Sequence, residues 1–302
     1  MAGYTGALRL VDGRALRAIL CAFRGDTGEF DPPEEPDAAL VELLERPFES
    51  AAGVSDRLGR LETRLREAGD RRAVFLTIYA RMTRAVREGI EGGRFNDPAW
   101  MRRYLIAFAD YYRRAFLAFE RGNVRAVPDP WRVAFGTATR GDALVAQDAF
   151  LGVNAHINYD LALAIRDVGI DPDRTEKHAD HRAIDGILSR ILDAQQDALA
   201  ELYATGIEDA DAALGRLDET LTLRSMTEGR EQAWRVAEVL TDARVPPIPS
   251  CTRWVLRATA TGGAFFIRGP ALDPSVVRRL REVEDDGVDA ILERIHQRLE
   301  GA

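Results

Sequence analysis

The sequence predicts an all-α protein: a single-domain, multi-helix bundle around a buried central helix. Apolar residues recur at helical spacing in one segment after another, while the alternation typical of strands is scarce. Residues 143–165 carry apolar side chains around the whole helix circumference, which is typical of a helix buried on every side. With 302 residues, the chain can bury a large core without disulfides.

Amphipathic patterns predict the helices of the N-terminal half. Residues 54–68 and 71–91 carry apolar side chains three or four positions apart, which places them on one helix face. An aspartate followed by proline marks a helix start, because the carboxylate caps the first amides and proline fits the first turn. This start signal occurs at Asp97-Pro98, Asp129-Pro130 and Asp273-Pro274.

The C-terminal half is also predicted to be helical, with one ambiguous stretch. Residues Ser225 to Glu228 have capping-box spacing and open a helix that runs through Leu240. Residues 244–250 hold three prolines and are predicted to form a loop. Residues 254–267 combine β-branched and aromatic residues around two glycines, so a small hairpin and a helix with a turn both fit them.

The central helix contains polar residues that are costly to bury. A carboxylate in a core is paired, binds a metal, or becomes neutral through a shifted pKa. His156 and Asp160 lie about 40° apart on one helix face, so one partner can touch both. Gly152, one turn earlier, leaves room for a ligand or another helix. Asn154 and Asn158 point to the other side, where we expect them to bind backbone or a neighbouring helix.

A second stretch repeats the spacing of the first. His181 and Asp185 form another His-x-x-x-Asp pair, and three of the four histidines fall within residues 156–181. Imidazole and carboxylate ligands suit Zn, Fe or Mn, and helix bundles build metal sites from such groups on facing helices. The predicted ligands of a divalent metal are His156, Asp160, His181, Asp185 and His178. A purely structural polar network is the competing interpretation.

One motif carries a family resemblance. The run from Leu151 to Leu161 looks like the signature Leu-Gly-x-Asn-Ala-His-Ile-Asn-x-Asp-Leu of an uncharacterised family of bacterial and archaeal proteins of unknown function. The resemblance covers about residues 70–240 and implies an α-helical fold, but it implies no known reaction. In that family an asparagine often stands where this chain has Asp185. A more distant similarity links the two pairs to zinc-dependent phospholipase C, although no histidine precedes His156 here.

The leading functional hypothesis is a metal-dependent hydrolase or lyase. A bound metal would lower the pKa of a water molecule, with Asp148 or Asp180 as the general base. Arg230 could hold an anionic group of a small-molecule substrate. Two alternatives remain open. One is a non-catalytic helical protein with a structural polar core. The other is an isoprenoid-type cyclase, suggested by the aspartates of residues 285–289.

Composition and charge narrow the remaining classes. The net charge of −8 disfavours nucleic-acid binding, which relies on basic surfaces. Only two cysteines are present, so we expect no disulfide framework and a cytoplasmic location. The polar residues of the central helix argue against a membrane span. We expect residues 1–50 to pack on the core as a helical and loop segment, 51–245 to form the helical core domain, and 246–302 to be an extension ending in a helix.

Overall fold

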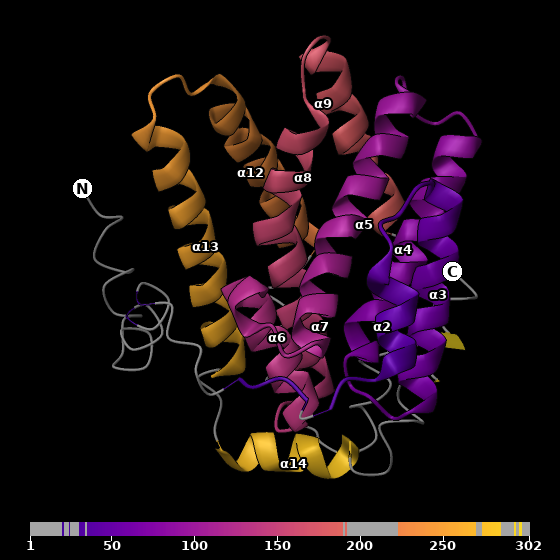
Figure 1. Ribbon diagram of the computed structural model, residues 1–302, viewed down its shortest axis with the longest axis vertical. Helices are drawn as coiled ribbons and strands as arrows, with labels where there is room; N and C mark the ends of the chain where they lie inside the picture. The colour runs from indigo at the N-terminus through magenta and orange to yellow at the C-terminus, as the bar shows by residue number, and fades with distance from the viewer. Residues whose placement is uncertain are drawn as a thin grey trace.

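The structure is a computed structural model that describes residues 30–33, 35–189, 223–269 and 274–284, with a few single residues besides. Within these ranges every regular element is a helix and no strand occurs. The predicted all-α, single-domain arrangement is therefore confirmed (Figure 1).

The described elements follow one another along the chain as short and long helices. Their bounds are α2 Ala38–Glu45, α3 Ala51–Glu67, α4 Ala73–Glu91, α5 Pro98–Glu120, the 3-10 turn η2 Val124–Ala126, α6 Asp129–Arg140, α7 Val145–Ala155, the π turn η3 His156–Asp160, α8 Leu161–Val168, α9 Arg174–Ala183, α12 Leu223–Asp242, α13 Pro247–Arg268 and α14 Pro274–Glu284. The longest of these lie roughly along the long axis of the molecule, as Figure 1 shows.

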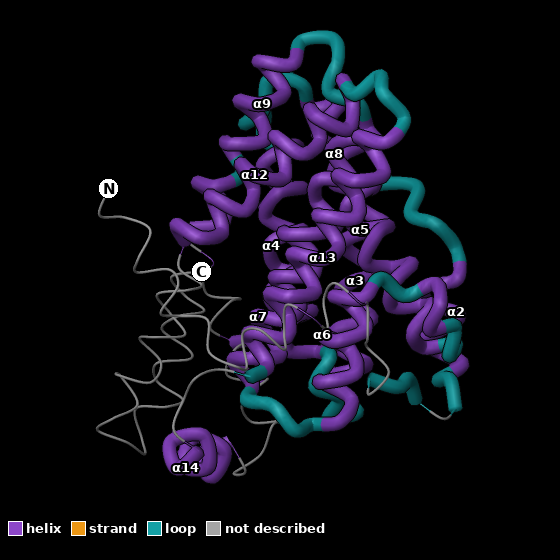
Figure 2. Tube along the Cα trace, turned by 90° about the vertical axis from the view of Figure 1, so that its left-hand side faces the viewer, coloured by secondary structure: helices purple, strands orange, loops and turns teal. Residues whose placement is uncertain are grey.

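The predicted central helix is the rod made of α7, η3 and α8. It runs between two groups of helices, with α4 and α5 on one side and α12 and α13 on the other. Helix α7 packs on α4 and α13, and helix α8 packs on α5 and α12. Figure 2 shows α9 beyond one end of the rod and α14 beyond the other. The rod is thus flanked on both sides, which is why its apolar residues surround it.

The helix starts were predicted with mixed success. Asp97 caps α5 as predicted, accepting a hydrogen bond of 2.8 Å from the amide of Trp100. Helix α6 instead begins at Asp129 itself, whose carboxylate accepts from Arg257 of α13 at 2.7 Å rather than capping the helix. The start predicted at Ser225 is wrong, because Leu223 already belongs to α12. Leucine is a good helix former, so the capping-box spacing lies inside the helix. Asp273 lies outside the described residues.

The ambiguous stretch 254–267 is one continuous helix, so the hairpin alternative is wrong. Two glycines suggested a turn, but Gly263 serves a close packing contact. A Cβ atom there would lie 2.7 Å from Oδ1 of Asn154 on α7. The predicted loop at 244–250 is also wrong in part, because α13 begins at Pro247, where proline suits a first turn.

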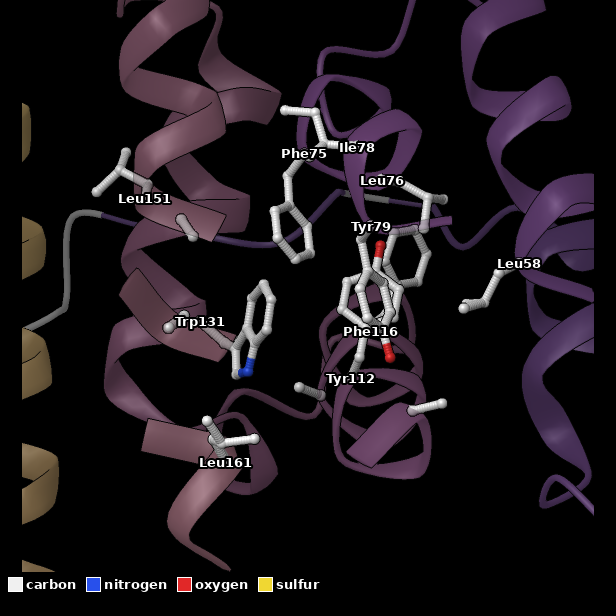
Figure 3. Close-up of a cluster of buried hydrophobic side chains, with 14 of the residues drawn as sticks. Leu58, Phe75, Leu76, Ile78, Tyr79, Tyr112, Phe116, Trp131, Leu151 and Leu161 are labelled. Atoms are coloured by element: carbon white, nitrogen blue, oxygen red, sulfur yellow. The ribbon is translucent and has the colours of Figure 1, made fainter. Parts of the chain in front are cut away.

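An aromatic cluster fills the space between α4, α5, α6 and the rod. Figure 3 shows the rings of Phe75 and Trp131 close together, and they meet edge to face with centroids 5.6 Å apart. Gly152 is where this cluster meets the rod. A Cβ atom at Gly152 would lie 2.2 Å from Cγ of Phe75, so the room predicted there is taken by Phe75, not by a ligand.

Among the described helices, none is sufficiently long and apolar to cross a membrane.

Candidate functional site

The rod changes its hydrogen bonding at the two ionisable residues of the motif. From His156 to Asp160 it is a π turn, in which the Leu161 amide bonds the His156 carbonyl. Single π turns within α-helices are often found at functional sites. Both side chains are buried, with His156 2% and Asp160 0% exposed.

His156 and Asp160 form the pair that their spacing predicted. Nδ1 of His156 lies 3.0 Å from Oδ2 of Asp160, and the indole Nε1 of Trp131 donates to the same oxygen at 2.7 Å. Two atoms of this pair have no hydrogen-bond partner among the described residues: Nε2 of His156 and Oδ1 of Asp160. Unpaired buried polar atoms are rare in native proteins and call for an explanation.

Burial shifts the pKa of each partner in the direction that favours its neutral form. It raises the pKa of Asp160, against the opposing effect of the hydrogen bonds from His156 and Trp131. It lowers the pKa of His156, against the opposing effect of Asp160. The imidazole is therefore neutral at pH 7. A neutral ring that donates from Nδ1 to the carboxylate leaves a lone pair on Nε2, which is the arrangement of a general base.

Aromatic rings hold the imidazole in place. Phe108 stacks on it with ring centroids 3.6 Å apart and planes 7° from parallel. Tyr79 meets it edge to face at 4.4 Å. Together with the bond to Asp160, these contacts fix the direction in which Nε2 points.

His156 lines a cavity of about 70 Å³ between α4, α5, the rod and α12. On a scale of ~10–15 Å³ per water, this volume holds roughly five water molecules. Its walls are mostly aliphatic and aromatic. The polar side chains that line it are Tyr79, Thr83, Tyr104, His156 and Arg230. The predicted site residues His156 and Arg230 therefore share one cavity.

The second predicted pair, His181 and Asp185, does not form. The Tyr104 hydroxyl lies 2.9 Å from Nδ1 of His181, and Nε2 of His181 lies 3.1 Å from the carbonyl oxygen of Arg230. Because a carbonyl only accepts, Nε2 carries the proton and Tyr104 donates to Nδ1. Burial, and next the charge of Arg230, hold the pKa of His181 well below its ordinary value. Both ring nitrogens are thus occupied.

Asp185 is bound to Arg230 instead. Nε of Arg230 donates to Oδ1 of Asp185 at 2.7 Å, and the same guanidinium donates to the backbone carbonyl of His181. Arg230 is 3% exposed and lines the cavity. Asp185 and His181 line a separate groove on the outer side of α9 and α12. The ion pair therefore lies between the cavity and this groove.

The other predicted residues make structural contacts. Asp180 accepts from the amides of Asn96 and Asp97 at 2.8 and 2.7 Å, ahead of the start of α5. His178 lies 2.9 Å from a carboxylate oxygen of Glu231 on α12. Asp148 is bound by Arg71 at 2.7 Å, and burial raises its pKa to about 7. None of these side chains lines the cavity.

The described residues do not fit the predicted metal centre. Nowhere among them do three His, Cys, Asp or Glu side chains come together so that they could share an ion. The nitrogens of His181 are occupied, and Asp185 is held by Arg230. What the site offers is one orientated imidazole with a buried carboxylate behind it.

Several residues of the site were not predicted from the sequence. Trp131 orientates Asp160, and Tyr79 and Phe108 hold the imidazole. One signal was available for Trp131: a buried indole N–H needs an acceptor, and few acceptors exist in an apolar core. Nothing in the sequence pairs Phe108 with His156, because their contact joins α5 to the rod.

Comparison with known proteins identifies the family but no activity. A model described as a family of unknown function (DUF5995) matches residues 51–268, and the chain belongs to that family. The match extends beyond the predicted residues 70–240 at both ends. No match was found among curated proteins, and none among solved structures.

Proposed function

We propose that the protein is an acid–base enzyme of the hydrolase or lyase type, in which His156 moves a proton on a small molecule bound in the cavity. The observation that supports this most directly is the state of His156. Its Nδ1 is held by Asp160, while its Nε2 is buried without a partner on a ring that lines the cavity. A histidine that served only the core would have both nitrogens satisfied, as His181 does.

In a hydrolysis, Nε2 would take a proton from a water molecule as its oxygen attacks the substrate carbonyl. The imidazolium formed would be stabilised by Asp160, as a carboxylate does in other histidine-based sites. Nε2–H would then return the proton to the leaving oxygen, which restores the neutral ring. In an elimination, the same nitrogen would take the proton from carbon and return it to the leaving group. Neither route needs the predicted metal ligands.

A chemical test of this proposal needs no known substrate. Bromoacetone is small, neutral and alkylates nucleophilic imidazole nitrogens, forming an N–C bond as bromide leaves. We expect peptide mass spectrometry to find the adduct on His156, with a rate about ten-fold above that of His178. The matched control is His178→Gln, which removes a histidine outside the cavity and should leave the rate at His156 unchanged.

The same reagent can contradict the proposal. If His156 in the folded protein reacts no faster than His178, its Nε2 is not available to a molecule in the cavity. Asp160→Asn gives a second readout, because loss of the carboxylate should slow alkylation of His156 by about ten-fold. An unchanged rate in that variant would mean that Asp160 does not tune the ring.

A second candidate function is non-catalytic binding of a small apolar molecule. It is favoured by one observation: among the described lining residues there is no cysteine or serine, and Nε2 of His156 has no hydroxyl partner there that it could activate. If the protein only binds, the His156→Gln variant should take up ligand in the cavity as well as the natural protein does. Bromoacetone should then not react with His156 in the natural protein.

A further inference from the structure

Arg230 is the charged side chain in the cavity wall, and its counter-ion Asp185 faces the outer groove. Of the described residues that line the cavity, Arg230 alone is charged at neutral pH. Its protein counter-ion, Asp185, does not line the cavity but the outer groove. Asp185 is 23% exposed at its side chain, whereas Arg230 is 4% exposed. Water can thus solvate the carboxylate of this pair far better than the guanidinium.

Asp185 satisfies only part of the guanidinium. Oδ1 of Asp185 accepts from Nε, and one terminal nitrogen of the guanidinium donates to the His181 carbonyl. An arginine has five N–H donors arranged to bind a carboxylate with two parallel bonds. Tyr104 also lines the cavity, and its hydroxyl oxygen accepts from Arg230. Its single O–H already donates to His181, so the guanidinium supplies the donors at this end. This end of the cavity therefore offers hydrogen bonds to a planar anion.

We infer that the cavity takes a short-chain monocarboxylate, whose carboxylate binds Arg230 in exchange for Asp185 while its apolar chain contacts Phe108, Leu105 and Met82. The volume of about 70 Å³ suits a molecule of roughly six non-hydrogen atoms. This inference rests on the proposed function, because it names the substrate class of the same cavity.

The charge balance favours a carboxylate over a phosphate. A phosphate monoester brings about two negative charges and three acceptor oxygens. Against these the lining residues present one cation, and the buried Asp160 adds a further acidic group nearby. A carboxylate brings a single charge, which Arg230 neutralises once Asp185 turns out into the groove.

The inference can be tested with two isosteric probes, butanoate and butanamide, titrated into the purified chain and followed by NMR chemical shifts or calorimetry. We expect butanoate to bind about ten-fold more tightly, because a hydrogen bond to an ionised group is much stronger than one to a neutral group. The informative variant is Asp185→Asn, which keeps an acceptor for Nε but removes the competing charge. In that variant, butanoate should bind several-fold more tightly and butanamide should not change.

Three outcomes would overturn the inference. One is equal affinity for the two probes in the natural protein. Another is the same change for both probes in Asp185→Asn, which would report a general opening of the cavity. The third is no binding of butanoate at concentrations up to about 50 mM. Arg230→Gln should reduce butanoate to the affinity of butanamide. If that variant does not fold, Asp185→Asn still decides the question.

These results are separable from those of the proposed function. Alkylation of His156 by a neutral reagent tests the base without any anion. If His156 is alkylated but butanoate shows no preference, the enzyme proposal stands and the substrate class is wrong. If butanoate is preferred but His156 is unreactive, the cavity binds carboxylates without the proposed chemistry.

Discussion

His156–Asp160 and His181–Asp185 have the same spacing in the sequence, yet only the first pair forms a hydrogen bond. At the rod, Trp131 is the other described donor to Asp160, and it binds the same oxygen without displacing His156. At the end of α9, the charged Arg230 binds Asp185, and the ring of His181 contacts the Tyr104 hydroxyl and a backbone carbonyl.

The difference shows what a His-x-x-x-Asp spacing specifies. Within one continuous element, as at His156–Asp160, it brings two side chains to one side. His181 lies in α9, whereas Asp185 follows the end of that helix at Ala183, and neighbouring helices decide which bonds each side chain makes. The first pair keeps Nε2 without a partner and lines the cavity, while the second pair has both ring nitrogens satisfied. We therefore propose the function at His156 and Asp160. Asp185, from the second pair, serves as the counter-ion of Arg230.

The largest difference between the two pairs is expected when each carboxylate is removed in turn. Asp160→Ala leaves the buried donors of His156 and Trp131 without an acceptor, and we expect it to lower the free energy of unfolding by about 3–5 kcal/mol. Asp185→Ala leaves Arg230 without its counter-ion, but Asp185 is 23% exposed at a groove from which water can take its place, so we expect about 1–2 kcal/mol. Urea denaturation measures both. Equal losses would show that the two pairs do not differ in burial as described.

A smaller effect is expected from two glycines, one in each region. Gly152→Ala places a methyl group against the ring of Phe75, and overpacking of this kind costs about 1–3 kcal/mol. Gly186 lies next to Asp185 and has no atom within 4 Å of an added Cβ. Gly186→Ala is the matched control and should be neutral or stabilising by about 0.5–1 kcal/mol. Thermal unfolding of both variants tests the contrast, which fails if Gly152→Ala is tolerated equally well.

Much of the fold could be predicted from local pattern. The stripes of residues 54–68 and 71–91 and the Asp97 cap correspond to α3, α4 and α5. Predictions failed where a residue serves a distant contact. Gly263 suggests a turn, yet it lies within α13, where the lack of a Cβ lets Asn154 pack against it. Such contacts between remote parts of the chain leave no periodic signal in either segment.

The candidate site was predictable only in part. The His156–Asp160 bond follows from four-residue spacing in a buried helix, and the bond of Asn154 to the Ala260 carbonyl of α13 follows from its opposite direction. That Arg230 reaches the same cavity as His156 depends on how α12 packs on the rod. No feature of either segment alone specifies that packing.

The weakest expected effect is a difference in acid sensitivity between the two buried histidines. The pKa of each is lowered in the folded protein, mainly by burial, and that of His181 is lowered further. A histidine with a lowered folded pKa contributes stability that is complete above its unfolded pKa of about 6.5 and is lost as the pH falls below it.

Unfolding free energies of the natural protein, His181→Gln and His156→Gln at about pH 7.5 and about pH 5.5 test this order. Each histidine can contribute a slope of at most about 1.4 kcal/mol per pH unit. We expect His181→Gln to remove about 1 kcal/mol of the acid-induced loss and His156→Gln to remove less.

Asp148, whose pKa is raised to about 7, acts in the opposite direction, since its contribution is lost as the pH rises toward 7. It is present in all three proteins, so it cancels in the differences. A larger change for His156→Gln would reverse the order, because it would mean that the ring at the cavity is harder to protonate than the ring with two partners.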